Sequence, residues 1–225
     1  MSLQRVAIID DQIYGRETVA GWVEDLFDAR PIPFEGPLSN PEELLTWIRS
    51  QQIDAVIIDH KLNNSGYSEH DGLHIAATLF ERRMPTVLAT SYERKNIKSY
   101  VWYGGKVPSV VRKGLLQATL PQAMELAQLR IQGKHTQWTE PYPTIVRINS
   151  VDKDEVGLII SAFSPHDGIL VDRQELQDRL HCTLSEGLRF GADVNIGART
   201  SEELYLENLR KLDEMRSDYA PLLYT

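Results

Sequence analysis

Cysteine is almost absent from this chain: Cys182 is the only one among 225 residues. A single cysteine cannot form an internal disulfide, and no cysteine/histidine spacing typical of a zinc site occurs. The sequence therefore excludes a small domain held together by disulfides or zinc. It is also typical of a protein of the reducing cytoplasm, where we expect this one.

Long apolar runs are missing as well. The first residues, Met1 to Arg5, lead directly into a short apolar segment, without the basic and long apolar regions of a secretory signal. The longest apolar runs are far shorter than the roughly 20 residues that a membrane helix needs. We therefore expect no association with a membrane.

Basic charge is in short supply. The formal net charge is −8, from 24 Lys or Arg against 32 Asp or Glu. The excess is concentrated after Pro143, where nine basic residues face fifteen acidic ones. Because nucleic-acid binding relies on a basic surface, we expect no nucleic-acid partner.

What is present, in the first half, is an alternation of strand and helix patterns. Short β-branched runs are typical of strands buried on both faces of a parallel sheet; they cover residues 6–9, 55–58, 86–89 and 109–112, with a short irregular strand at 32–34. Helical patterns separate them, near residues 16–27, 40–51, 72–83, 93–103 and 115–132. This order predicts a five-stranded parallel sheet with helices on both faces.

The pattern changes after a linker rich in proline and polar residues. We expect a first domain over residues 1–133, a linker over 134–143 and a second domain over 144–225. The second domain shows strand patterns at 145–151, 156–163, 169–171 and 188–196, separated by turn sequences. We predict a small β-rich, barrel-like domain with a terminal helix over about 201–216.

Polar residues stand where the predicted strands of the first domain end. Asp10 and Asp11 close one strand and Asp59 closes another. Because ligands of open α/β sheets bind beyond the carboxyl ends of the strands, these carboxylates should meet there. Carboxylate and carbonyl oxygens suit Mg²⁺, so we expect a metal site made of these three side chains and the backbone carbonyl of Lys61.

Two further polar residues end neighbouring strands. Thr90 follows one run and Lys113 follows another. Carboxylates can form aspartyl phosphates, which makes Asp59 a candidate phosphoacceptor. Lys113 could then pair with phosphoryl oxygens, and the Thr90 hydroxyl could donate to one of them.

As a set, these residues resemble the receiver (CheY-like) domain of bacterial two-component response regulators. The acidic pair corresponds to Asp10 and Asp11, the phosphoacceptor to Asp59, and the hydroxyl and lysine residues to Thr90 and Lys113. The resemblance covers about residues 3–132. It implies a flavodoxin-like fold, Mg²⁺ as cofactor, and a histidine kinase or phosphotransfer protein as partner.

The chain departs from the family at several positions. Gly114 follows the lysine where the family usually has proline, and Val110 stands where it usually has a tyrosine or phenylalanine. The segment between Asp59 and Gly72 is several residues longer than usual. These departures leave the site intact but alter the family's route from phosphorylation to output; Tyr92, Tyr100, Trp102 and Tyr103 are candidates for the missing aromatic residue.

We therefore expect a response-regulator-like signalling protein whose second domain acts on an unknown protein target. A pseudo-receiver adaptor that works without phosphorylation is the alternative. We expect no enzyme beyond the receiver's own phosphoryl transfer and dephosphorylation, because Lys61 stands where a haloacid-dehalogenase phosphatase would need a second acid.

Some features remain open. A homodimer through the last helix of the first domain is possible in principle. His70 and His74 stand four residues apart but lack an evident third metal ligand. Arg189, Asn195 and Arg199 could bind a polar ligand or simply face solvent.

Overall fold

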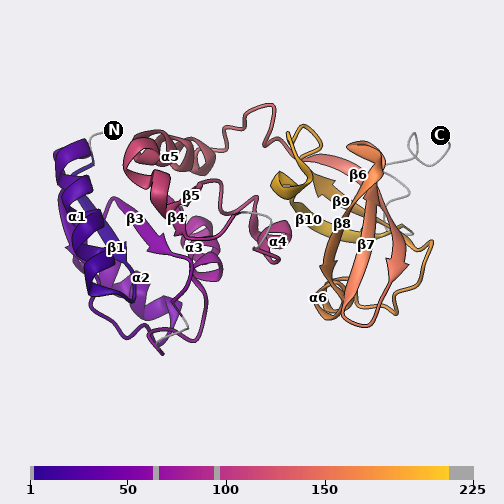
Figure 1. The fold of residues 1–225 in the computed structure, drawn as a ribbon, viewed down its shortest axis with the longest axis horizontal. Coiled ribbons are helices and arrows are strands. Elements are labelled where there is room, and N and C mark those ends of the chain that lie inside the picture. Colours follow the sequence, from indigo (N-terminus) through magenta and orange to yellow (C-terminus); the bar gives the residue numbers. More distant parts are fainter. Residues whose placement is uncertain (1–2, 63–65, 94–96, 213–225) are drawn as a thin grey trace. The chain divides into compact units, whose positions relative to one another are not determined.

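The computed structural model describes residues 3–62, 66–93 and 97–212. The chain divides into two compact units (Figure 1). The first contains residues 1–93 and 106–134, and the second contains residues 94–105 and 135–225. The second unit is therefore discontinuous in sequence, because it includes residues 94–105, which interrupt the first unit.

A five-stranded parallel sheet forms the centre of the first unit. Its strands run in the spatial order β2-β1-β3-β4-β5, and each neighbouring pair is parallel. Their bounds are β1 (Arg5–Ile9), β2 (Arg30–Pro33), β3 (Ala55–Asp59), β4 (Thr86–Thr90) and β5 (Val110–Arg112). This is the flavodoxin-like order, in which the chain reverses direction across the sheet at β1 and β3. The predicted fold class of the first domain is confirmed.

Helices cover both faces of this sheet. They are α1 (Ile13–Phe27), α2 (Pro41–Ser50), α3 (Gly72–Glu81) and α5 (Leu116–Ile131), the last preceded by the 3₁₀ turn η2 (Lys113–Leu115). Helices α1 and α5 contact each other, as do α2 and α3, and Figure 1 shows the two pairs on opposite faces of the sheet. No helix among the described residues is long and apolar enough to cross a membrane.

Strand burial explains why the sequence pattern was readable. Every residue of β3 and β4 is buried, so these strands are continuous apolar runs and not alternating ones. The predicted apolar stripe of α5 packs on the sheet, with Leu116 and Leu120 inaccessible to solvent. The stripe is therefore core; whether the chain dimerises stays a prediction.

The helix predicted near residues 93–103 is shorter in the structure and lies in the second unit. It is α4 (Tyr100–Tyr103), preceded by described residues from Ile97 onward. Val101 and Trp102 are 8% and 4% exposed and join the hydrophobic core of the second unit. The amphipathic pattern that predicted this helix thus reflects packing on the second unit's sheet.

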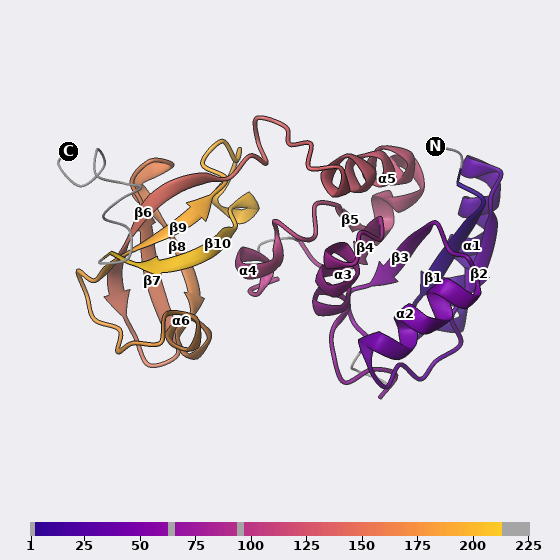
Figure 2. The ribbon, with the colours of Figure 1, turned by 180° about the vertical axis from the view of Figure 1, so that it is seen from behind.

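The second unit is built on an antiparallel sheet in the order β10-β9-β6-β7-β8 (Figure 2). Its strands are β6 (Tyr142–Val151), β7 (Glu155–Ile160), β8 (Ser164–Asp172), β9 (Arg189–Val194) and β10 (Leu206–Lys211). The predicted β-rich second domain is confirmed as a five-stranded antiparallel sheet. Helix α6 (Arg173–Leu180) contacts β8 and β10.

Two details of this unit differ from the sequence prediction. The terminal helix expected over 201–216 is wrong for the described residues: the 3₁₀ turn η3 (Ser201–Glu203) leads into β10, and residues 213–216 lie outside the described part. Pairing with β9, which begins at Leu206, outweighs the helical propensity, and the extended chain buries Leu204, Tyr205 and Leu206 in succession. Helix α6 was not predicted, although Asp172 caps it by accepting from the Glu175 amide.

Candidate functional site

The carboxyl ends of the parallel strands bring the predicted acidic residues together. Asp10 and Asp11 follow β1, and Asp59 is the last residue of β3, which pairs with β1. One carboxylate oxygen from each of the three lies within 4.8 Å of the others. Asp10 and Asp59 are buried, with exposures of 4% and 6%. Three carboxylates gathered with so little solvent repel one another strongly unless a cation lies beside them.

Lys113 supplies one positive charge. Its Nζ atom lies 2.9 Å from an Asp10 oxygen and 3.0 Å from an Asp59 oxygen. Burial lowers the pKa of Lys113, but its hydrogen bond to Asp10 and its attraction to Asp59 outweigh burial and leave the pKa raised. The lysine is therefore charged at neutral pH and bridges the two carboxylates.

Asp59 is the carboxylate whose environment is least favourable to charge. Burial raises its pKa above 3.8, Lys113 opposes this effect, and the neighbouring charge of Asp10 adds to it. A carboxylate that is buried beside a like charge is stabilised by a further cation close to it. Its role as phosphoacceptor stays a prediction.

Backbone contacts from two helices fix the acidic residues in place. The Gln12 amide donates to an Asp10 carboxylate oxygen at 2.9 Å, and the Arg16 guanidinium donates to the Asp10 carbonyl at 2.6 Å. At Gly15, a Cβ atom would come within 2.6 Å of the Asp10 carboxylate. Helix α1 therefore passes so close to Asp10 that a side chain at position 15 would have to displace the Asp10 carboxylate, a constraint that no sequence pattern indicated.

Helix α3 begins in similar contact with Asp59. A Cβ atom at Gly72 would lie 1.9 Å from the Asp59 carbonyl oxygen. The Gly72 amide donates to the His60 carbonyl at 2.8 Å, and Asp71 caps the helix by accepting from the His74 amide. The Asp71-Gly72 pair thus sets the start of α3 directly against the strand end that carries the candidate phosphoacceptor.

Thr90 and Lys61 lie close to Asp59, because β4 pairs with β3 and Lys61 stands two residues after Asp59 in the chain. Thr90 ends β4, is 1% exposed, and has its hydroxyl 3.3 Å from the His60 Nδ1 atom. Lys61 directs its side chain to Tyr92, with Nζ 5.4 Å from the ring centroid. Its backbone carbonyl as a metal ligand stays a prediction. Sequence reasoning missed His60, although its place directly after Asp59 was a usable signal.

The acidic cluster fits a hard divalent cation. It offers only oxygen ligands, as Mg²⁺ and Ca²⁺ prefer, and it is the one group of three or more acidic, histidine or cysteine ligands among the described residues. A small, mainly apolar cavity of about 60 Å³ lies between α1, α5 and the sheet and reaches Asp10, Asp59 and Lys113 at one end.

The other candidate residues form no comparable site. The rings of His70 and His74 stack with centroids 4.9 Å apart, without a third ligand among the described residues. Asn195 is buried and donates to the carbonyls of Trp138 and Glu203, so its role is structural. The Arg199 guanidinium lies 5.0 Å from the centroid of the Trp138 ring. Trp138 precedes β6, and Arg199 lies between β9 and η3.

No family model and no curated protein sequence matches the chain. Several solved structures are similar to its first part. The signal receiver domain of an HD domain-containing protein from Pseudomonas fluorescens Pf-5 is 15% identical, with a TM-score of 0.45, over 59% of this chain and 92% of that one. The CheY-like response regulator receiver domain from Methylobacillus flagellatus is 20% identical, with a TM-score of 0.43, over 56% of this chain and 99% of that one.

The RcsB response regulator of Salmonella typhimurium is 17% identical, with a TM-score of 0.45, over 60% of this chain. The match spans 63% of the RcsB chain, less than two thirds of it. All three scores are below 0.5, so the class of the first unit rests on its own strand order and connections. These define a receiver-like, flavodoxin-like α/β fold with an acidic cluster at the carboxyl edge of the sheet.

Proposed function

We propose that this chain is a response-regulator-like signalling protein that accepts a phosphoryl group on Asp59 in a Mg²⁺-dependent reaction. The observation that carries the proposal is the meeting of Asp10, Asp11 and Asp59 at one strand edge with Lys113 between two of them. The donor would be a histidine kinase or a phosphotransfer protein. The second unit would carry the output to a protein target and not to nucleic acid.

The chain's own residues account for the proposed transfer. A carboxylate oxygen of Asp59 would attack phosphorus as the bond from phosphorus to the leaving group breaks, which gives an acyl phosphate and the released donor group. The Lys113 ammonium group, which lies 3.0 Å from an Asp59 oxygen, would then form an ion pair with a phosphoryl oxygen. Asp10 and Asp11, together with Asp59 and the Lys61 carbonyl, would hold Mg²⁺, which would neutralise charge on the transferred group.

The chain would be no enzyme in the ordinary sense, because its only reactions would be its own phosphorylation and the hydrolysis of the phosphoryl group on Asp59. The alternative is a pseudo-receiver adaptor whose acidic cluster is a structural ion-pair network. The bridging position of Lys113 favours this alternative, because the lysine already pairs with two of the three carboxylates without a metal.

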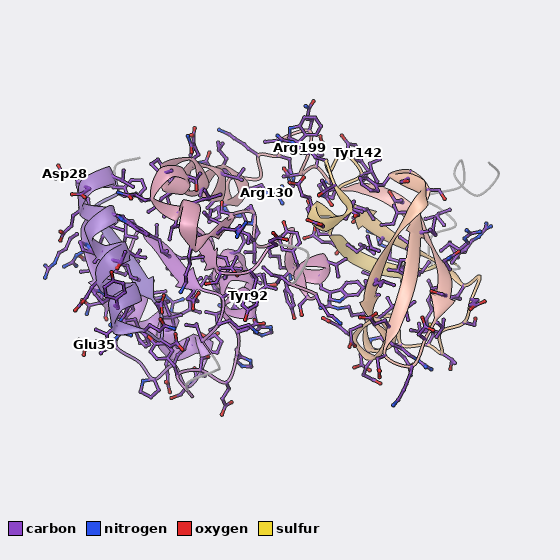
Figure 3. All side chains as sticks on the ribbon, viewed as in Figure 1. Asp28, Glu35, Tyr92, Arg130, Tyr142 and Arg199 are labelled. Atoms are coloured by element: carbon purple, nitrogen blue, oxygen red, sulfur yellow. The ribbon has the colours of Figure 1, made fainter. Side chains whose placement is uncertain are left out.

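Intact mass after incubation with Mg²⁺ and acetyl phosphate separates the two. We expect one added phosphoryl group on the wild-type chain and none on Asp59→Asn. The matched control is Asp28→Asn, the same substitution at an exposed residue at the end of α1, labelled in Figure 3; it should be modified like the wild type. If the wild type gains no group under conditions that modify a known receiver domain, the adaptor function stands instead.

A further inference from the structure

The hydroxyl of Thr90 is already engaged in this structure. Its oxygen accepts a hydrogen bond from the Tyr92 amide at 3.1 Å and lies 3.3 Å from Nδ1 of His60. Tyr92 lies just beyond the end of β4 (Figure 3). Both Thr90 and His60 are buried, at 1% and 5% exposure. Breaking this contact therefore costs free energy, because bulk water does not reach either side chain to replace the lost partner.

The direction of the second hydrogen bond depends on the tautomer of His60. A hydroxyl has one proton to donate and two acceptor positions, of which the Tyr92 amide fills one. In the tautomer that carries its proton on Nε2, the ring offers Nδ1 as an acceptor and the Thr90 hydroxyl donates to it.

The backbone holds His60 in this position. Its amide donates to the Ala89 carbonyl at 2.8 Å, and its carbonyl accepts from the Gly72 amide at 2.8 Å. The edge of its ring meets the Tyr92 ring, with centroids 6.0 Å apart and planes at 89°. The imidazole is therefore fixed between the strand end, the start of α3 and the Tyr92 ring.

We infer that His60 is a positioning residue that competes with a phosphoryl group on Asp59 for the single proton of the Thr90 hydroxyl. This inference rests on the proposed function. In the unphosphorylated chain, the Thr90 hydroxyl donates its proton to Nδ1 of His60 in a hydrogen bond. A phosphoryl oxygen must displace that acceptor before Thr90 can donate to it, so His60 opposes the phosphorylated state.

A change of partner at Thr90 also alters the surroundings of Tyr92. The Tyr92 amide donates to the Thr90 hydroxyl, its ring meets His60, and Lys61 lies over that ring. The position of Val110 holds no aromatic ring that could respond to Thr90. The Tyr92 ring, which packs against His60, is an aromatic ring that can respond to a change at Thr90.

Two substitutions at position 60 separate the acceptor from the bulk of the ring. His60→Asn keeps an acceptor oxygen at about the place of Nδ1, whereas His60→Leu fills much of the same volume without one. The probe is beryllofluoride with Mg²⁺, which imitates a phosphoryl group on a carboxylate and is titrated against the intrinsic fluorescence of the full chain. A neutral hydrogen bond corresponds to a factor of roughly 2 to 12 in an equilibrium constant.

We therefore expect His60→Leu to bind beryllofluoride about 5-fold more tightly than the wild type, and His60→Asn to bind like the wild type. In a Thr90→Val background the gain from His60→Leu should vanish, because no hydroxyl remains to be released. The inference is overturned if His60→Leu binds no more tightly, if both His60 variants shift alike, or if the gain persists in Thr90→Val.

A spectroscopic measurement keeps the test valid should His60→Leu fold poorly. In the wild type, the ¹⁵N resonance of His60 Nδ1 should have the shift of a hydrogen-bonded acceptor, and it should move toward that of a free acceptor in Thr90→Val and on adding beryllofluoride. If the resonance moves neither in Thr90→Val nor on adding beryllofluoride, the role of His60 is overturned and the proposed function is not. A wild type that binds no beryllofluoride and takes no phosphoryl group overturns the proposed function, and the competition with it.

Discussion

Replacing Lys113 with methionine removes the positive charge that bridges the two buried carboxylates and leaves a side chain of similar length. Oxygens of Asp10 and Asp59 lie within 4.8 Å of each other. At that separation two like charges repel by about 3 kcal/mol if the effective dielectric constant is 20. Because the Lys113 side chain is one-third exposed, solvent screens part of this, and we expect a loss of about 1 to 3 kcal/mol in the free energy of unfolding.

Magnesium should reverse that loss. A cation bound by the same carboxylates replaces the missing charge, and a ligand present at 100 times its dissociation constant stabilises the folded state by about 2.7 kcal/mol. Lys113→Met should therefore gain more stability from Mg²⁺ than the wild type. Since the pKa of Lys113 is raised above 10.5, the stabilising pair is fully present at neutral pH and is lost only as the pH rises through that higher value.

The assay is urea unfolding at neutral pH, followed by circular dichroism in EDTA and again in excess Mg²⁺. Lys106→Met is the matched control, because Lys106 pairs with Glu81 at the surface and its loss should cost less than about 0.5 kcal/mol in either buffer. Equal stability of Lys113→Met and the wild type in EDTA would refute the electrostatic reasoning. An Mg²⁺ effect no larger than that on Lys106→Met would refute the assignment of the cluster as a metal site.

Three further predictions concern the same fold. Asp59→Asn should be about 1 kcal/mol more stable than the wild type at neutral pH without Mg²⁺; because the pKa of Asp59 is raised, the difference should shrink as the pH falls through that pKa, which urea titrations at several pH values would show. Gly72→Ala should lower the melting temperature and prevent phosphorylation, since its Cβ meets the Asp59 carbonyl, whereas Gly114→Ala, with open space around its Cβ, should do neither. Trp102→Ala should cost about 3 kcal/mol or more and reduce hydrogen-exchange protection in β6–β10 before β1–β4, while Trp138→Ala, at a 39% exposed residue, should cost about 1 kcal/mol or less.

The sequence was most informative where burial leaves a periodic trace. Strands β1, β3 and β4 are apolar at almost every position, because both faces are covered, and each is followed or ended by a polar residue. The convergence of Asp10 and Asp59 at one edge follows from parallel pairing alone. The receiver-like fold and its acidic cluster were therefore predictable.

Other features depend on contacts that no local pattern encodes. Leu204 to Leu209 has a spacing compatible with a helix, and only pairing with β9 makes it a strand, with a register shift between Glu207 and Arg210. The contact of Gly15 with Asp10 and of His60 with Thr90 joins residues from different elements. The sequence places His60 directly after Asp59, but its contact with Thr90 follows only from the pairing of β3 with β4.

The membership of residues 97–105 in the second unit determines where the chain can be divided into fragments. The chain passes between the units at positions 93–94, 105–106 and 134–135. A cut at the apparent linker alone would leave the first fragment with Val101 and Trp102 stripped of their apolar surroundings, and the second with a hole in its core. We therefore expect fragments or gene fusions that divide the chain at residue 134 to yield two destabilised parts.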